Sequence, residues 1–197
     1  MHDSLTLVGG SNSTRHQYQS VQAEEVWTLA YLHDEIPEAT RFFEIHRKHE
    51  LSPRRWDICR SIRHAPIYMV QRFDDIPCSN AYPLSNVSRQ LFGNLYIDHG
   101  PAEPFGSTFD YMLGLAIVNN WHRINVFGFD MSTNTEYFYQ RPGAHLLIGV
   151  ALGRGMEVYI APGSKLIDNR RYGYEGYPQL TEAARARVGM VLDQVKW

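Results

Sequence analysis

A turn of glycine and hydroxyl residues can bind phosphate, because its backbone N–H groups and hydroxyls can approach an anion closely. The sequence has such a turn directly after its first apolar run, Leu5–Val8. Glycine also serves tight turns that need a positive φ, so a phosphate cradle and a plain turn are both open interpretations. The turn matches neither G-x-G-x-x-G nor a Walker loop. Its candidate ligand-binding residues are Gly9, Gly10, Ser11, Asn12 and Ser13.

A carboxylate, Asp130, follows Gly128-Phe129 at the end of another apolar run, residues 124–129. At the end of a buried strand, such a carboxylate suits a ribose hydroxyl or Mg²⁺. We therefore treat Asp130 as a candidate catalytic residue and metal ligand, with Mg²⁺ as the expected cofactor. The alternative is an aspartate that caps the following turn beside Ser132 and Thr133.

Arg141 is a candidate ligand-binding cation. It precedes Pro142, which predicts a position at the entrance of an apolar helix. A cation is unfavourable at a helix N-terminus, and a bound anion would relieve that conflict through the bidentate guanidinium. The alternative is a structural salt bridge with Asp130 or Glu136.

Four further residues have both a ligand-binding and a structural interpretation. Ser107 and Thr108 are expected at a helix start, where they form either an anion site or a simple cap. Trp27 and Tyr31 belong to the second predicted strand and its end, and they either stack on a nucleobase or belong to the core.

Glu44 and His46 end another predicted strand and are candidate general bases. His46 and His49 are three residues apart, a spacing that would place two metal ligands on one helix face. Such short spacings also arise by chance, and no cysteine joins them.

The elements that must position these residues alternate between short apolar runs and helical segments. Strands are expected at residues 5–8, 25–30, 41–45, 67–70, 124–129 and 157–160, and helices at 108–118, 143–152 and 181–197. This alternation predicts an α/β fold, a Rossmann-like three-layer sandwich with a mainly parallel central sheet. Ligands of such sheets bind beyond the carboxyl ends of the strands.

One domain with a C-terminal appendage is expected. Residues 1–178 form the nucleotide-binding domain, and residues 179–197 form a C-terminal helix. Residues 72–104 contain four prolines and are expected to be an irregular functional loop or lid.

Composition narrows the function classes. The chain has 197 residues, 44% of them hydrophobic, and a net charge of −2. This charge argues against bulk nucleic-acid binding, and no apolar run is long enough to span a membrane. Two cysteines, Cys59 and Cys78, provide no disulfide framework, and the first residues do not resemble a signal peptide. Together these features favour the cytoplasm.

The order of several motifs resembles a family of bacteriophage proteins of unassigned activity, which would place the protein in the host cytoplasm. The match runs from the first strand to Tyr174. It includes Leu-Val-Gly-Gly-Ser-Asn-Ser, Glu-Val-Trp-Thr-Leu-Ala and Arg-Phe-Phe-Glu-Ile-His, and then Phe105 to Met112, Val126 to Met131, Glu136 to Pro142, and Gly153 to Gly155.

More distantly, the chain is similar to archaeal-type 6-hydroxymethyl-dihydropterin pyrophosphokinases and to bacterial sialyltransferases that use a CMP-sugar. Both groups share the small-residue turn, the Ser/Thr helix start and the Gly-x-Asp strand end, here Gly9–Ser13, Ser107-Thr108 and Gly128–Asp130. Two sialyltransferase features are missing: the proline of their first turn and a late histidine base, since the last histidine is His145.

This resemblance implies a nucleotide-dependent transferase that moves a glycosyl or diphosphoryl group. An alternative is a non-catalytic phage protein that captures a nucleotide. A third possibility is an assembly protein whose final helix pairs with another copy in a homo-oligomer.

Overall fold

A seven-stranded sheet is the scaffold of the chain. The structure is a computed structural model, and it describes residues 2–93, 96–97, 100–101, 104–132 and 137–167. Met1–Ile167 form one compact unit. The predicted C-terminal helix and the predicted domain boundary at residue 178 lie outside the described residues.

The strands lie in the order β5-β4-β3-β2-β1-β8-β9, and every neighbouring pair is parallel. Each predicted strand is present, which confirms the Rossmann-like parallel sheet. The bounds are β1 (His2–Val8), β2 (Glu25–Leu29), β3 (Arg41–Glu44), β4 (Ile67–Met69), β5 (Ser79–Ala81), β8 (Trp121–Phe127) and β9 (Glu157–Ile160).

The order of the strands has a switch point between β1 and β8. From β1 the chain proceeds through β2, β3, β4 and β5 to one edge of the sheet. It then returns to place β8 on the other side of β1 and continues outward to β9. The segments that follow β1 and β8 therefore leave in opposite directions, and ligands of open α/β sheets bind in the crevice at such a point.

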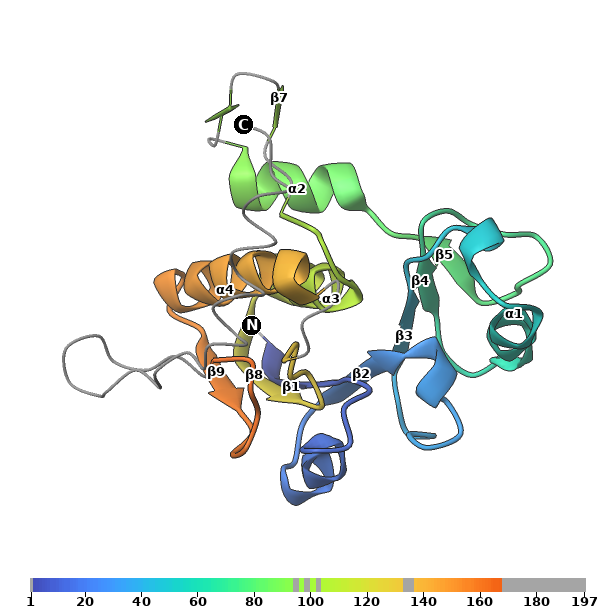
Figure 1. Cartoon of the computed structure of the whole chain (residues 1–197), viewed down its shortest axis with the longest axis horizontal. Coiled ribbons are helices and arrows are strands. Elements are labelled where there is room, and N and C mark those ends of the chain that lie inside the picture. Colours follow the sequence, from blue (N-terminus) through green and yellow to red (C-terminus); the bar gives the residue numbers. More distant parts are fainter. Residues whose placement is uncertain (1, 94–95, 98–99, 102–103, 133–136, 168–197) are drawn as a thin grey trace, which may run out of the picture. The chain divides into compact units, whose positions relative to one another are not determined.

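Helices cover both faces of the sheet (Figure 1). Because successive side chains of a strand point to opposite faces, Leu7 packs with the α2, α3 and α4 side and Val8 with the α1 side. This arrangement confirms the predicted three layers. The helices are α1 (Pro53–Ser61), α2 (Leu84–Phe92), α3 (Thr108–Val118) and α4 (Tyr137–Gly153), with short 3-10 helices η1 (Arg15–Ser20), η2 (Ala30–Leu32) and η3 (Lys48–Glu50).

Helix α3 begins as predicted, with Ser107 as its N-cap. The Ser107 hydroxyl accepts a hydrogen bond from Asp110 N at 3.3 Å, and Asp110 Oδ2 accepts one from Ser107 N at 2.8 Å. This reciprocal capping box satisfies two N–H groups that the first helical turn leaves without partners.

The prediction that residues 72–104 are irregular is wrong in part. The segment contains β5 and α2, and a separate antiparallel pair, β6 (Tyr96–Ile97) with β7 (Gly100–Pro101). Leu84, Val87 and Leu91 recur at helical spacing in α2, and Pro83 lies just before it, where a proline does not break a helix. The prolines of the segment lie outside its helix and hide this periodicity.

The predicted start of α4 at Gly143 is also wrong. The helix begins at Tyr137, so Pro142 lies inside it and Arg141 lies beyond its entrance. A proline removes one backbone hydrogen bond, a loss that packing can offset. Such packing is tight here, since a Cβ on Gly143 would lie 2.4 Å from Pro104 O. No helix in the described part of the chain combines the length and apolarity needed to cross a membrane.

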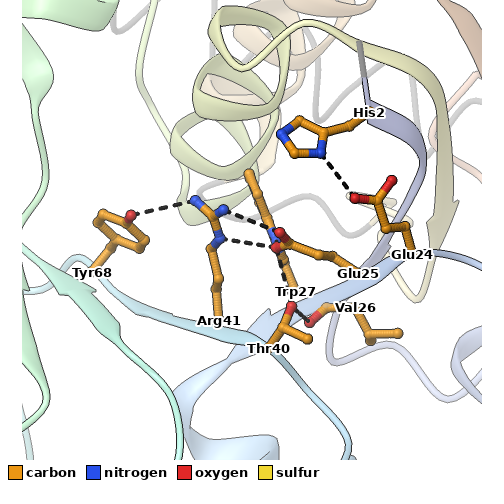
Figure 2. Close-up of polar contacts among 8 residues, drawn as sticks. All are labelled: His2, Glu24, Glu25, Val26, Trp27, Thr40, Arg41 and Tyr68. Carbon is orange, nitrogen blue, oxygen red and sulfur yellow. Dashed lines mark hydrogen bonds and ion pairs between the residues drawn. The ribbon is translucent and has the colours of Figure 1, made fainter.

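A polar network joins the amino ends of β2 and β3 (Figure 2). Glu25 Oε2 accepts hydrogen bonds from Trp27 Nε1 at 2.5 Å and from Arg41 Nε at 3.0 Å, and Thr40 Oγ1 donates to the same oxygen at 3.2 Å. The Arg41 guanidinium lies 4.6 Å from the centroid of the Trp27 ring. Partial burial opposes ionisation, but the donors outweigh it and lower the pKa of Glu25 below its usual value.

We expect Glu25→Gln to lower the free energy of unfolding at pH 7 by about 2 kcal/mol, the scale of a charge-assisted hydrogen bond. A carboxyl whose folded-state pKa is depressed stabilises the fold above its unfolded-state pKa and loses that effect as pH falls through the folded-state pKa. The variant and the wild type should therefore converge in acid. Urea unfolding from pH 7 to pH 3 measures this.

The matched control is Glu24→Gln, since Glu24 is the next residue along the chain and its ion pair with His2 is exposed (Figure 2). Exposed pairs contribute little, so its effect should be much smaller. Equal losses in both variants would contradict the structural role of the Glu25 network.

Candidate functional site

The carboxyl ends of β1 and β8 approach each other closely. Gly9 N donates to Phe127 O at 2.8 Å, and Ser11 N donates to Gly128 O at 2.8 Å. A Cβ on Gly9 would lie 2.5 Å from Gly128 O, and a Cβ on Gly128 would lie 2.5 Å from Gly9 O. Gly9 therefore serves the close approach of two backbones, whereas Gly128 has in addition a positive φ of 69°.

This approach places the first turn against Asp130. Ser11 Oγ donates to Asp130 Oδ2 at 2.8 Å, and Ser13 Oγ donates to the same oxygen at 2.5 Å. Lys165 N donates to Asp130 Oδ1 at 3.3 Å. Burial opposes ionisation, but these donors prevail and hold the pKa of Asp130 below its usual value. The switch point thus carries an ionised carboxylate.

Part of the first turn is occupied by contacts within the protein. The N–H groups of Gly9 and Ser11 bond to the carbonyls of Phe127 and Gly128 at the end of β8, so they are not available to a phosphate. Arg15 stabilises the turn, because its guanidinium donates hydrogen bonds to Gly10 O at 3.2 Å and to Asn12 Oδ1 at 2.6 Å. A phosphate site here stays a prediction, and it depends on the remaining groups of the turn and on Arg15.

Arg141 lies beside Asp130, as predicted, but it contacts backbone. Its Nη2 donates to Asp130 O at 3.4 Å and to Lys165 O at 2.5 Å. Among the described residues, the buried Arg141 Nε has no hydrogen-bond partner. The guanidinium therefore joins α4 to the segments after β8 and β9, and an anion contact stays a prediction.

Ser107 and Thr108 lie at the start of α3, close to the same end of the sheet. The ring of Phe109 packs 4.6 Å from the ring of Phe129, which follows β8. The structure gives Ser107 a capping role, and no described contact joins Ser107 or Thr108 to Asp130.

Asp110, next to these residues, is a feature that the sequence analysis missed. Its side chain is fully buried, and Oδ2 accepts N–H groups of Gly106 and Ser107 at 2.9 and 2.8 Å. Its Oδ1 has no hydrogen-bond partner in the described part of the chain. Burial raises the pKa of Asp110 to about 7, although both hydrogen bonds act in the opposite direction.

A second group of polar side chains lies at the carboxyl end of β3. Glu44 is 2% exposed, yet both of its oxygens have charged partners. Oε1 lies 2.6 Å from His46 Nδ1, and Oε2 lies 2.7 Å from Arg55 Nη2. The hydrogen bond with Glu44 raises the pKa of His46 above its usual value, against the opposing effects of partial burial and Arg55. Glu44 and His46 thus form a carboxylate–histidine pair at the predicted strand end.

The expectation that His46 and His49 share a helix face is wrong. His46 follows β3, whereas His49 lies in η3, where its partner is Glu50 at 4.0 Å. The described residues contain no cluster of three or more histidine, cysteine, aspartate or glutamate side chains that could hold a metal ion.

Tyr31, after β2, lies between the two groups. A Cβ on Gly10 would lie 2.0 Å from the Tyr31 hydroxyl, so this oxygen sits directly on the first turn. The Arg55 guanidinium lies 5.3 Å from the centroid of the Tyr31 ring. Tyr31 therefore touches the β1 turn at one end and the Glu44–Arg55 pair at the other.

Trp27 belongs to the core. Its side chain is 0% exposed, with Phe43 at 5.7 Å and Trp121 at 6.2 Å between ring centroids. A ring enclosed in this way presents no face to a nucleobase, so the core interpretation replaces the stacking one.

Arg55 is a site residue that sequence reasoning missed. Arg55 comes from α1, a helix that was not predicted although Ser52-Pro53 is a typical N-cap and first helical residue. Tyr31 follows a strand whose carboxyl end was already expected to face the ligand. Two open hollows lie elsewhere; one, at the amino ends of β1, β8 and β9, is lined by residues that include Asp3, His122 and Glu157.

Comparisons with known proteins give one weak structural likeness. No protein-family profile matches the chain, and no curated protein matches it. Among solved structures, it is similar to the sialyltransferase CstII from Campylobacter jejuni, solved in complex with a substrate analogue, cytidine-5′-monophosphate. The identity is 11%, the alignment covers 96% of this chain and 99% of that chain, and the TM-score is 0.40.

Substitution by alanine should lower the folding stability by different amounts at the two glycines of the first turn. Gly9→Ala places a methyl group against the Gly128 backbone and should cost about 2 kcal/mol or more of folding stability, as overpacking does. Gly10→Ala meets the end of the Tyr31 side chain, which can rotate away, so it should cost much less. Thermal unfolding of both variants checks this, and a larger loss in Gly10→Ala would contradict the geometry.

Asp110 should make stability pH-dependent. A carboxyl whose pKa is raised in the folded state makes its full contribution to stability at pH values below its unfolded-state pKa. For Asp110 this contribution to stability is lost as the pH rises through about 7. Relative to the wild type, Asp110→Asn should therefore gain on the order of 2 kcal/mol of stability between pH 5 and pH 8. Melting curves at both pH values measure the difference, and a difference that does not change with pH would show an unperturbed carboxyl.

Proposed function

We propose that this protein is a nucleotide-dependent transferase whose donor binds at the carboxyl ends of β1 and β8 and that moves a glycosyl or diphosphoryl group to a hydroxyl. One observation carries the proposal: Ser11 and Ser13 hydrogen-bond to Asp130 across the switch point of a parallel sheet. Nucleotides bind at this place in open α/β sheets, where a carboxylate accepts hydrogen bonds from ribose hydroxyls.

The charges around the switch point suit a nucleotide. Asp130 is ionised and supplies acceptors for ribose, and Arg141 lies beside it. Arg15, which pairs with Glu35 at 2.8 Å, adds positive charge at the first turn. In this proposal the free groups of Gly10, Asn12, Ser107 and Thr108 contact the phosphates, and Arg141 offsets their charge.

Mg²⁺ is part of the proposal. This ion commonly binds through one or two carboxylates together with the phosphates of the substrate. Asp130 is the carboxylate that would take this role, with the hydroxyls of Ser11 and Ser13 as neighbouring oxygens. When bound, Mg²⁺ would neutralise charge on the leaving phosphate.

His46 is proposed as the general base. An ionised carboxylate can only accept hydrogen bonds, so Glu44 fixes the proton of the neutral imidazole on Nδ1 and leaves Nε2 as the basic nitrogen. Nε2 takes the proton of the acceptor hydroxyl. The hydroxyl oxygen bonds to the transferred carbon or phosphorus, and the bond from that atom to the nucleotide phosphate breaks, with its electron pair leaving on the phosphate oxygen.

The distance between the two groups suits a nucleotide donor. Neighbouring strands are about 4.8 Å apart, so the end of β3 lies roughly 10 Å along the sheet edge from the end of β1. Tyr31 lies in this interval and touches Gly10. A donor seated on the first turn would therefore extend its transferable group over Tyr31 toward His46.

The test combines binding with turnover. Thermal-shift and calorimetric titrations use nucleoside mono- and diphosphates, CMP among them, and nucleotide sugars, each with and without Mg²⁺. Mass spectrometry then follows the loss of each bound compound in the presence of hydroxyl acceptors. We expect binding that Asp130→Asn weakens by about tenfold or more, on the scale of a charged hydrogen bond.

His46→Gln separates an enzyme from a binding protein. It should retain nucleotide affinity and lose about 10²-fold or more in turnover, the contribution of a general base. The matched control is His49→Gln, because His49 is an exposed histidine of the same segment and should be neutral. Tight binding with no turnover in the wild type would favour the ligand-capturing alternative, and no nucleotide binding at all would overturn the proposal.

A further inference from the structure

We propose that Arg55 is a positioning residue for the His46 base, and that Tyr31, Arg55 and His46 line the subsite for a hydroxyl-bearing acceptor. This inference rests on the proposed function, because it specifies where and how the second substrate of that reaction is activated. Arg55 acts through Glu44: it holds one oxygen of this carboxylate so that the other oxygen orients the imidazole.

The geometry divides the two oxygens of Glu44 between its two partners. Oε2 receives Arg55 at 2.7 Å, and Oε1 receives His46 at 2.6 Å. Burying a carboxylate is costly unless it is paired and hydrogen-bonded, and Glu44 is 2% exposed. Arg55 thus supplies the charged partner that the buried Glu44 carboxylate needs. Without a fixed carboxylate, the imidazole would lose both its tautomer and its orientation.

The exposure of the side chains defines the subsite. Glu44 is enclosed, whereas the side chains of His46 and Arg55 are 47% and 34% exposed. Tyr31 is 39% exposed and extends from Arg55 to the first turn. A hydroxyl compound that contacts these three side chains would lie beside the proposed donor with its hydroxyl at Nε2. The amino-end network of Glu25 offers a contrast, because its carboxylate and its arginine are about four-fifths buried and bonded to each other.

Three charged groups act on His46. Glu44 on β3 and Glu50 on η3 favour the imidazolium, and Arg55 on α1 disfavours it. Arg55 therefore has a second effect besides orientation, since it lowers the pKa of His46 from the value that Glu44 alone would impose. A lower pKa leaves more of the neutral imidazole, the form that can accept a proton near neutral pH.

The first experiment is an NMR titration of the histidine rings in the full chain, with His46 assigned from its missing signals in His46→Gln. Arg55→Gln should raise the pH at which His46 titrates by about 0.5–1 pH unit, the effect of one partly screened neighbouring charge. Arg55→Lys, which keeps the charge but not the bidentate fork, should restore most of that value. Arg54→Gln is the matched control, an exposed arginine of the same helical turn.

The second experiment measures transfer by the wild type and the same variants. Arg55→Gln should lower kcat about 10- to 100-fold, the usual loss when the partner that orients a catalytic histidine is removed. The rising limb of its pH–rate profile should move to higher pH with the His46 titration. Affinity for the nucleotide that binds best should stay within about twofold, because Arg55 does not touch the β1–β8 junction.

The outcomes separate this inference from the proposed function. If the nucleotide binds and is turned over, but Arg55→Gln leaves the His46 titration and the pH–rate profile unchanged, the positioning role is overturned. If no nucleotide binds, the proposed function fails, and the NMR titration alone decides whether Arg55 tunes His46. If Arg55→Gln does not fold, Arg55→Lys is compared with Glu44→Gln instead. Glu44→Gln should lower the pH at which His46 titrates, and Arg55→Lys should change that pH by a smaller amount.

Discussion

The close approach of Gly9 and Gly128 is the constraint on which the rest of the site depends. A Cβ on either residue would lie 2.5 Å from the carbonyl oxygen of the other. The hydrogen bonds from Gly9 N and Ser11 N hold the ends of β1 and β8 together. This contact brings Ser11 onto a carboxylate that lies 119 residues later in the chain. A larger residue at either position would separate the strand ends and break the contact of the serines with Asp130.

Buried carboxylates show how the same sheet supports both stability and chemistry. At the amino end of the sheet, Glu25 accepts hydrogen bonds from Arg41 and Trp27, and all three side chains belong to one structural network (Figure 2). At its carboxyl end, Glu44 is equally well paired, but one of its partners is a half-exposed histidine that can exchange a proton with a ligand. The difference lies in the partner rather than in the carboxylate, because a guanidinium stays charged at all relevant pH values whereas an imidazole titrates near neutrality.

Local patterns in the sequence predict much of the fold. The six apolar runs became strands because short buried segments bounded by turn residues have few alternatives, and α3 begins at its N-cap because capping is local. The errors fall where local signals conflict. In α2 the neighbouring prolines hide the helical spacing of Leu84, Val87 and Leu91, and in α4 packing tolerates Pro142 within the helix.

The candidate site residues also show which information is local and which comes from tertiary contacts. The sequence by itself determined that Gly9–Ser13, Glu44, His46 and Asp130 lie at or just after the ends of strands, because the strand boundaries follow from local apolarity. Tertiary structure decided which of these residues meet: the strand order placed β8 beside β1, and the packing of α1 brought Arg55 to Glu44. It also placed Trp27 in the core and aimed Arg141 at backbone carbonyls. Strand order and helix packing depend on contacts between residues far apart in the chain, and no pattern within a single segment contains that information.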